Sequence, residues 1–258
     1  MANLKFDECF LKNTQKTITV NNLLHIHDTN IQLYFSVYSD DCYCPVCFQA
    51  KLSFVANAKT PHFRSINKHL ESCEYNFKAT TKKQAEDFYS DTNNRETINR
   101  MLRSCIDSLY QKTYTDKTEE TRKSVNSHSS SPFIVLINSN KRRFRKKRIT
   151  AVFHDEDYNI KMIFYGKVLI KWEKDDTDWF LIIKNNAQEC VCKIKVTGKV
   201  YYYIDDRMKF SGLKAGKVAF IAEMKEYKGC NSSYIRRSSD LMINLEDIVD
   251  DCIGDMSL

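Results

Sequence analysis

The spacing of four cysteine and histidine residues constrains this chain more than any other feature of its sequence. Cys44 and Cys47 form a C-x₂-C pair, and His69 and Cys73 follow as an H-x₃-C pair. A C-x₂-C turn directs two thiolates to one point, and two residues four apart on a helical turn lie on one face. Because three thiolates and an imidazole suit the closed tetrahedral geometry of structural Zn²⁺, we expect these four residues to bind one zinc ion.

Two alternatives to this ligand set remain open. His62, in the sequence Pro61-His62-Phe63, competes with His69 for the fourth position, and the cluster could instead be a group of buried free thiols. Cys42 precedes Cys44 by two residues, and we expect it to be a spectator. No apolar stretch typical of a secretory signal follows Met1, so we expect a cytoplasmic protein whose ten cysteines are thiols or metal ligands rather than disulfides.

Two resemblances accompany the cysteine pattern. The Cys44–Cys47 knuckle, the segment Lys51–Val55, Pro61–Arg64 and Cys73–Tyr75 together resemble the zinc finger of competence-protein CoiA-like bacterial proteins. That family usually carries a second histidine where this chain has Ser65, a difference that favours His69 over His62. The knuckle with Ile66–Cys73 also resembles the small zinc finger of eukaryotic DNA-repair ubiquitin ligases. Both resemblances imply a zinc finger in a protein that acts on DNA.

The rest of the sequence predicts an α+β protein in four parts. Hydrophobic residues make up 42% of the 258-residue chain, enough for packed cores. We expect a zinc-finger and helical domain at 1–114, with a strand at Ile31–Tyr38 and an amphipathic helix at 95–112. A polar, Ser/Thr-rich linker follows at 115–132, then a β-rich domain at 133–243 and an acidic tail at 244–258.

Period-two patterns in the β-rich domain predict a small barrel or sandwich. The expected strands are Phe133–Ile137, Lys161–Trp172, Asp178–Lys184, Cys190–Ile204, Lys217–Tyr227 and Ser233–Ile243. Four segments, Phe164–Val168, Asp178–Ile183, Lys195–Val200 and Leu213–Ile221, resemble the oligonucleotide-binding (OB) barrel of single-stranded-DNA-binding proteins. That resemblance implies stacking of bases on exposed aromatic side chains and phosphate contacts to Lys and Arg.

Candidate nucleic-acid contacts follow from this resemblance and from a dense basic run. Seven of the eight residues Lys141–Arg148 are basic, and such a density is typical either of a solvated loop or of a phosphate-binding segment. The candidate contacts are Arg142, Arg143, Arg145, Lys146, Lys147, Arg148, Trp172, Trp179, Tyr201, Tyr203 and Tyr227. For each aromatic residue, packing in a barrel core is the alternative.

We interpret the chain as a zinc-containing protein that binds nucleic acid, with single-stranded DNA favoured, in repair, recombination, uptake or defence against foreign DNA. A metal-dependent nuclease using Asp206, Glu223 and Lys225 is one alternative, and an adaptor whose zinc finger docks a protein is another. The acidic tail could occupy a cationic groove or bind a partner protein, and 239–249 could instead form an amphipathic helix. No segment is apolar enough to predict a membrane span.

Overall fold

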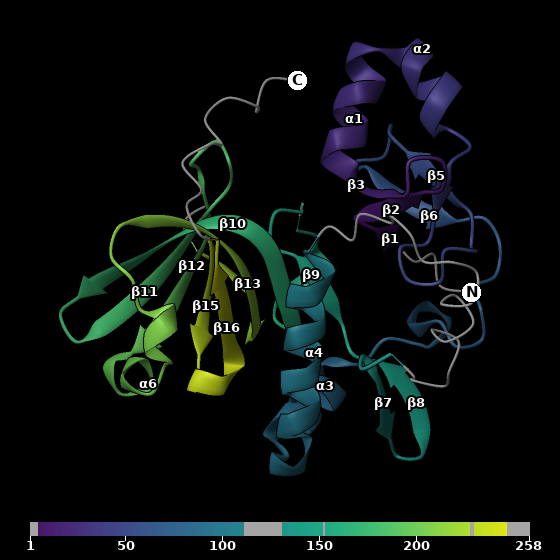
Figure 1. Cartoon of the computed structure of the whole chain (residues 1–258). Helices are drawn as coiled ribbons and strands as arrows, with labels where there is room; N and C mark the ends of the chain where they lie inside the picture. Colours follow the sequence, from purple (N-terminus) through teal and green to yellow (C-terminus); the bar gives the residue numbers. More distant parts are fainter. Residues whose placement is uncertain (1–4, 111–130, 152, 228–229, 247–258) are drawn as a thin grey trace. The chain divides into compact units, whose positions relative to one another are not determined.

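The computed structural model describes residues 5–110, 131–151, 153–227 and 230–246 (Figure 1). The chain forms two compact units, the first from residues 1–92 with 110–155 and the second from residues 93–109 with 156–258. These units divide the chain differently from the predicted domains. Helix α4 (Arg95–Ser108) belongs to the second unit, and the basic run Lys141–Arg148 belongs to the first.

The first unit combines short strands with short helices. Apart from β9, its described strands form the sheets β1-β6-β5, β3-β2-β4 and β7-β8. The strands are β1 (Lys5–Phe6), β2 (Glu8–Leu11), β3 (Lys16–Thr19), β4 (Cys42–Tyr43), β5 (Leu52–Val55), β6 (His62–Ser65), β7 (Ile134–Ile137), β8 (Asn140–Arg143) and β9 (Lys146–Arg148). The helices are α1 (Val20–Thr29), α2 (Ile31–Leu33), the π-helix η1 (Tyr34–Tyr38), α3 (Lys82–Ser90) and the 3₁₀ turn η2 (Glu74–Asn76). Two more 3₁₀ turns, η3 (Thr92–Asn94) and η4 (Asp155–Asp157), have only their first residue in this unit.

The predicted strand at Ile31–Tyr38 is wrong, because the segment is helical. Asn30 ends α1 by donating its backbone N–H to the carbonyl of Ile26 over 2.8 Å. Its side-chain oxygen then accepts the backbone N–H of Leu33 over 2.9 Å and so caps α2. The apolar alternation that suggested a strand instead leaves Phe35 exposed on a helix and buries Tyr34. A local cap therefore overrides the period-two pattern.

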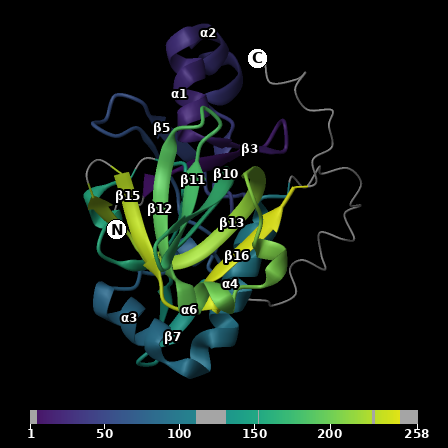
Figure 2. The same ribbon diagram turned by 90° about the vertical axis from the view of Figure 1, so that its left-hand side faces the viewer.

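The second unit is built on one twisted sheet with the strand order β14-β15-β12-β11-β10-β13-β16 (Figure 2). The strands are β10 (Lys161–Asp175), β11 (Asp178–Lys184), β12 (Cys190–Thr197), β13 (Leu213–Glu223), β14 (Lys225–Tyr227), β15 (Cys230–Ile235) and β16 (Leu241–Leu245). All neighbours in this order are antiparallel except β12 and β15, which are parallel. The remaining elements are α6 (Gly198–Tyr202), η5 (Asp206–Met208) and η6 (Ser238–Asp240).

Helix α4 covers part of this sheet. Its apolar stripe is buried and includes Ile98, Met101 and Leu102, and the helix contacts β10, β13 and β16 (Figure 1). The strands beneath contribute fully buried aromatic residues, among them Phe164 and Phe220, whose rings stack with centroids 5.5 Å apart. The predicted amphipathic helix is thus confirmed, and its apolar face belongs to the core of the strand-rich unit.

Most predicted strands of the second unit are confirmed in part, with corrections to their bounds. The predicted strand Lys217–Tyr227 is divided at Met224 into β13 and β14, and the predicted strand Ser233–Ile243 is wrong as a single strand, because η6 separates β15 from β16. The strand predicted for Cys190–Ile204 ends at Thr197, whose side chain accepts the backbone N–H of Val200 and caps α6. The predicted acidic tail begins too early, since β16 runs to Leu245 and Glu246 is ion-paired to Lys217 over 3.0 Å. Residues 239–246 form a 3₁₀ turn and a strand rather than an amphipathic helix. The rest of the tail, and residues 115–130 of the linker, lie outside the described residues.

The fold is therefore mixed helix and strand, as expected. The backbone pairing of the described residues closes none of the sheets into a barrel, since no ladder joins β14 to β16. No helix in the described part of the chain is both long enough and apolar enough to span a bilayer.

Gly198 begins α6 at a point where the backbone of the β10–β11 turn comes close. A Cβ atom on Gly198 would lie 2.7 Å from the carbonyl oxygen of Thr177. Backbone must shift to relieve such a contact, so we expect Gly198→Ala to lower the free energy of unfolding by about 1–3 kcal/mol. Urea denaturation checks this, with Lys199→Ala as the exposed neighbour that should stay within about 0.5 kcal/mol of the wild type. Equal stability of the two variants would contradict the close approach.

Candidate functional site

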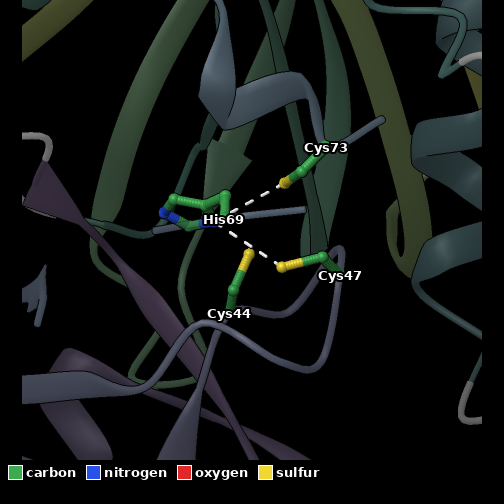
Figure 3. A group of neighbouring side chains, drawn as sticks. All are labelled: Cys44, Cys47, His69 and Cys73. Atoms are coloured by element: carbon green, nitrogen blue, oxygen red, sulfur yellow. Dashed lines mark hydrogen bonds between the residues drawn. The ribbon is translucent and has the colours of Figure 1, made fainter. Parts of the chain in front are cut away.

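The four predicted metal ligands come together in the first unit (Figure 3). Cys44 and Cys47 lie in the loop between β4 and β5, which an isolated bridge between Tyr43 and Lys51 closes. The backbone N–H of Phe48 donates to the carbonyl of Cys44 over 2.9 Å, and the N–H of Val46 points at the Cys44 sulfur over 3.5 Å. This knuckle holds both sulfurs on one side of the loop.

His69 and Cys73 approach the knuckle from the segment that follows β6. The predicted helical turn is wrong here, because residues 66–73 form an irregular loop. A turn in which the N–H of Cys73 donates to the carbonyl of Leu70 over 2.9 Å brings the two side chains together instead. The segment has no buried apolar side that could support a helix, since Ile66 and Leu70 are both exposed.

The geometry of the group fits a tetrahedral ion. One potential ligand atom from each of the four residues lies within 4.8 Å of all the others. The Nδ1 atom of His69 is 3.6 Å from the sulfurs of both Cys47 and Cys73. A tetrahedral ion bound at about 2.3 Å separates its sulfur ligands by about 3.8 Å, so small side-chain movements suffice to coordinate it. The cluster can therefore hold a metal ion.

The pKa values of the thiols also favour a bound cation. Hydrogen bonding with Cys47 and Cys73, together with burial, raises the pKa of the Cys44 thiol well above its ordinary value. Hydrogen bonds from Cys44 and Cys73 lower the pKa of Cys47 far below its ordinary value. Without a cation the sulfurs must share protons, because adjacent buried thiolates repel one another. A bound metal ion would replace those protons and allow all three sulfurs to be thiolates.

His69 rather than His62 is the histidine of this group. The Nδ1 atom of His69 faces the sulfurs, and its Nε2 atom is buried without a hydrogen-bond partner. The ring packs against Phe6 and Tyr75, with centroids 5.6 and 5.8 Å away. His62 lies on β6, where its Nδ1 is 2.9 Å from the carbonyl oxygen of Thr60. Cys42 also lies outside the group, as predicted.

Part of the basic run contacts the segment that directly follows Cys73, within the first unit. Glu74 directly follows Cys73 and is 1% exposed. Its carboxylate accepts the hydroxyl of Ser131 over 2.7 Å and pairs with Lys146 over 2.9 Å. The guanidinium of Arg143 lies over the ring of Tyr75, 4.8 Å from its centroid. These residues bind the segment after Cys73 to strands β8 and β9.

Other members of the run also have partners within this unit. Lys147 is 5% exposed and pairs with Asp7 over 3.1 Å, and Arg148 pairs with Glu8 over 2.6 Å. The run is thus not a uniform solvated loop: Lys141 is exposed on β8, while Arg142, Arg143 and Arg145 are half-buried. The sequence could not show this, because the acidic partners lie about 70 to 140 residues away.

The predicted aromatic contacts fall into two groups in the second unit. Trp172 is buried, and its indole N–H donates to the carbonyl of Met208 over 2.9 Å. Trp179 stacks on Tyr201 with centroids 4.0 Å apart and planes inclined by 8°. Tyr201 also meets the edge of Trp172 with centroids 5.0 Å apart. These three rings pack mainly on one another, so the packing alternative holds best for Trp172.

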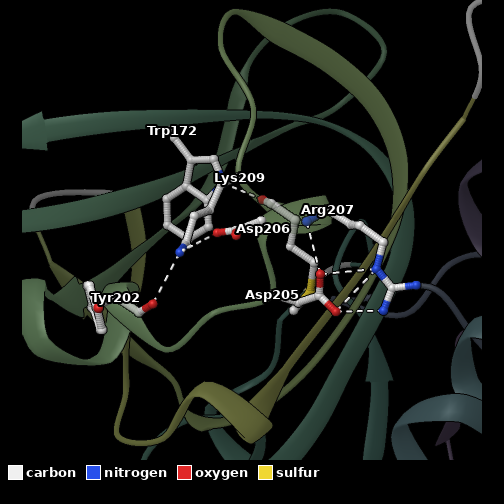
Figure 4. A network of polar contacts seen from close by, with 7 residues as sticks. Trp172, Tyr202, Asp205, Asp206, Arg207 and Lys209 are labelled. Atoms are coloured by element: carbon white, nitrogen blue, oxygen red, sulfur yellow. Dashed lines mark hydrogen bonds and ion pairs between the residues drawn. The ribbon is translucent and has the colours of Figure 1, made fainter.

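Tyr203 differs from them, because it is 67% exposed at the end of α6. Its neighbour Tyr202, which the sequence analysis did not select, is 76% exposed. Lys209 anchors this end of the sheet by donating to the carbonyl of Tyr202 and to Asp206 (Figure 4). The side chain of Tyr227 lies outside the described residues.

The residues of the nuclease hypothesis are not brought together. Asp206 is nearly fully exposed in η5 and pairs with Lys209. In the same turn, the carbonyl of Met208 accepts the indole N–H of Trp172, which lies near one end of β10. Glu223 pairs in the ladder with Lys161, at the other end of that strand. Lys225 is exposed on β14 beyond Glu223. A metal shared by Asp206 and Glu223 would need the two ends of β10 to meet.

Strand register reveals a set of residues that the sequence analysis missed. Residues paired directly across a ladder share one face of a sheet. One row therefore joins Lys171, Ile182, Lys193, Ser232 and Lys225 across five strands, and the next joins Glu173, Phe180, Lys195 and Tyr234 across four. We call Lys171, Phe180, Lys193, Lys195, Lys225 and Tyr234 the lysine–aromatic face. Strands β11, β12 and β15, which carry most of it, lie side by side in Figure 2.

Side-chain contacts define this face further. The ammonium of Lys193 lies over the ring of Phe180, 4.3 Å from its centroid. Lys195 pairs with Asp178 over 2.7 Å, and Tyr234 beside it is 42% exposed. The opposite side of the same strands is buried, including Leu181, Ile194 and Val196. The only sequence signal was the alternation of Lys193 and Lys195 with apolar residues on β12.

Comparison of the chain with models of known protein families gave no match, and no curated protein sequence is similar to it.

The metal group predicts a stability that depends on one bound ion. We expect one metal ion per chain in the wild type, and loss of that ion with destabilisation in Cys73→Ser, since binding energy at such a site is folding energy. Metal content and thermal unfolding with and without a chelator provide the measurements. His62→Asn is the matched control and should retain the ion. A full metal complement in Cys73→Ser would contradict the assignment.

The Glu74–Lys146 pair predicts a second effect on stability. Lys146→Met leaves the buried Glu74 carboxylate without its cation, so we expect a loss of about 3–5 kcal/mol of unfolding free energy. Lys141→Met, on the exposed part of the run, should change it by less than about 0.5 kcal/mol. Denaturant unfolding measures both. The double variant Lys146→Met/Glu74→Leu should recover most of the loss; failure to recover would assign the effect to Lys146 packing alone.

Proposed function

We propose that this chain is a zinc-containing nucleic-acid-binding protein that takes single-stranded DNA on the lysine–aromatic face of its second unit. The observation that carries the proposal is the register that places Lys193 and Lys195 beside Phe180 and Tyr234 on one face of the sheet. Both lysines and Tyr234 are exposed there, and Phe180 is half-buried. Single-strand binding needs this combination, because aromatic rings stack with bases and lysines contact the phosphates between them.

Zinc is the metal that best suits the cysteine and histidine group. Three thiolates and one imidazole are soft and borderline ligands, and they fill all four positions of a tetrahedral ion. Such a site is closed, so its role is structural and leaves no position for a substrate. Co²⁺ substitution tests the ligand set independently of stability, since thiolate coordination would give charge-transfer absorption that Cys73→Ser lacks.

The proposal treats the second unit as OB-like. OB folds are five-stranded, partly open barrels that bind oligonucleotides on the face of their second and third strands. If β10 is counted as the first strand, β11 and β12 are the second and third, and they carry Phe180, Lys193 and Lys195. Strand β14 follows β13 after a single residue, Met224, and pairs with β15. The two ends of the strand path β14-β15-β12-β11-β10-β13 are thus consecutive in the chain.

The net charge of the second unit gives no general attraction to DNA. The residues of the first unit include 21 Lys and Arg against 14 Asp and Glu, whereas the second unit has 19 of each. Attraction to a polyanion in the second unit therefore depends on the local lysines, not on the overall charge. On the first unit, we keep Lys141 and Arg142 as additional phosphate contacts, because the basic residues Lys146, Lys147 and Arg148 already have acidic partners.

A gel-shift panel tests the proposal. The wild type should bind single-stranded DNA without Mg²⁺, and its affinity should fall steeply with salt. Lys193→Gln/Lys195→Gln should weaken binding and flatten the salt slope by roughly 0.7 per lost contact. Phe180→Ala and Tyr234→Ala should weaken binding by about 1–3 kcal/mol each while leaving that slope unchanged.

The matched control is Arg100→Gln/Arg103→Gln, which removes the same charge from the exposed side of α4 in the same unit. It should bind almost as the wild type does. Equal weakening in the control and in the lysine variant would show general electrostatics and contradict the proposed face. DNA cleavage that requires Mg²⁺ would instead favour the nuclease hypothesis, and no binding to any nucleic acid would favour an adaptor.

A further inference from the structure

A pair of thiols lies at one end of the lysine–aromatic face. Cys190 is the first residue of β12, and Cys230 is the first residue of β15. Their sulfur atoms are 3.5 Å apart, although 40 positions separate them in the chain. The parallel ladder between the strands begins just beyond them, with Cys192 paired to Asn231. The two thiols therefore stand where β12 and β15 first meet.

Both cysteines face the same side as the lysines. A bulge between Ile183 and Lys184 shifts the β11–β12 register, so that Cys190 pairs with Lys184 and is exposed. Cys230 precedes Ser232 by two residues, and Ser232 lies in the row of Lys193. Cys192 is different, because it is fully buried with its sulfur 3.6 Å from the sulfur of Met224. Solvent thus reaches the Cys190–Cys230 pair and not the neighbouring thiol.

We infer that Cys190 and Cys230 are a modification site that forms a reversible disulfide by exchange with a small-molecule disulfide such as glutathione disulfide. One cysteine thiolate attacks the small disulfide and releases one thiol, leaving a mixed disulfide. The second cysteine thiolate then attacks the protein sulfur and releases the other thiol. Two cysteine S–H groups are oxidised to one S–S bond, while one small disulfide is reduced to two thiols.

The geometry favours this pair over the other close thiols of the chain. The two sulfur atoms are already 3.5 Å apart, and the spacing of adjacent strands lies within the Cα range of a disulfide. Cys9 and Cys42 also interact, but both are fully buried and beyond the reach of an oxidant. The thiols of Cys44, Cys47 and Cys73 are committed to the metal.

The surroundings set how readily the pair reacts. Burial, followed by the hydrogen bond with Cys230, raises the pKa of Cys190 to about 11, and the nearby Lys184 and Lys193 oppose that rise. The pair therefore rests as thiols at neutral pH. Exchange with an added disulfide is slow, because only a small fraction of the attacking cysteine is thiolate. Once formed, the bond would tie the start of β15, and the β14–β15 hairpin with it, to β12.

The test uses the full-length protein in a series of buffers that differ in the ratio of glutathione to its disulfide. After an acid quench and alkylation, tryptic digestion gives one peptide of residues 185–193 and another of residues 229–236. We expect these peptides to be disulfide-linked in oxidising buffers and separate after return to reducing ones. Because residues 185–193 contain both Cys190 and Cys192, the link must persist in Cys192→Ala and disappear in Cys190→Ser.

Absence of the link at every ratio, or its persistence in Cys190→Ser, would overturn the inference. A second measurement separates this result from the proposed function, on which the inference does not depend. If single-stranded DNA covers the lysine–aromatic face, it should slow alkylation of the reduced pair several-fold. Disulfide formation without such protection would support the modification site and count against the face as the place of DNA binding.

Discussion

The crowding of three sulfur atoms and one imidazole is the constraint on which the first unit depends. Cys44, Cys47, His69 and Cys73 come from two loops with few regular elements between them, and one ligand atom of each lies within 4.8 Å of the others. Buried thiols at this spacing either share protons or bind a cation. Further contacts hold the segment that follows Cys73 in place. Lys146 pairs with Glu74, and the guanidinium of Arg143 lies over the ring of Tyr75.

The sequence predicted those parts of the structure that local spacing determines. The grouping of Cys44, Cys47, His69 and Cys73 follows from two short motifs, and α4 follows from one apolar stripe whose residues are buried as expected. The strand predicted at Ile31–Tyr38 is wrong, because the alternation of apolar residues does not reveal that Asn30 caps a helix there. The meeting of His69 and Cys73 with Cys44 and Cys47 was predicted correctly, but on the wrong local structure, since a turn joins residues four apart as well as a helix does.

The remaining features needed partners that are distant in the chain. From sequence, the run Lys141–Arg148 is only a dense cluster of positive charge. In the structure, three of its residues form ion pairs with distant carboxylates: Lys146 with Glu74, Lys147 with Asp7 and Arg148 with Glu8. The lysine–aromatic face is invisible without the register that pairs Phe180 with Lys195 and Lys195 with Tyr234. Among the aromatic residues chosen from sequence, Trp172 proved to be buried packing and not a surface contact.

The most direct test of the account is to map where single-stranded DNA contacts the chain. Ultraviolet crosslinking of an oligonucleotide that carries bromouracil, followed by mass spectrometry of the linked peptides, reports contacts on aromatic side chains. The account predicts crosslinks at Phe180 on β11 and Tyr234 on β15, which share one face of the sheet. Crosslinks confined to Tyr202 and Tyr203 at the end of α6, or to the first unit alone, would contradict it.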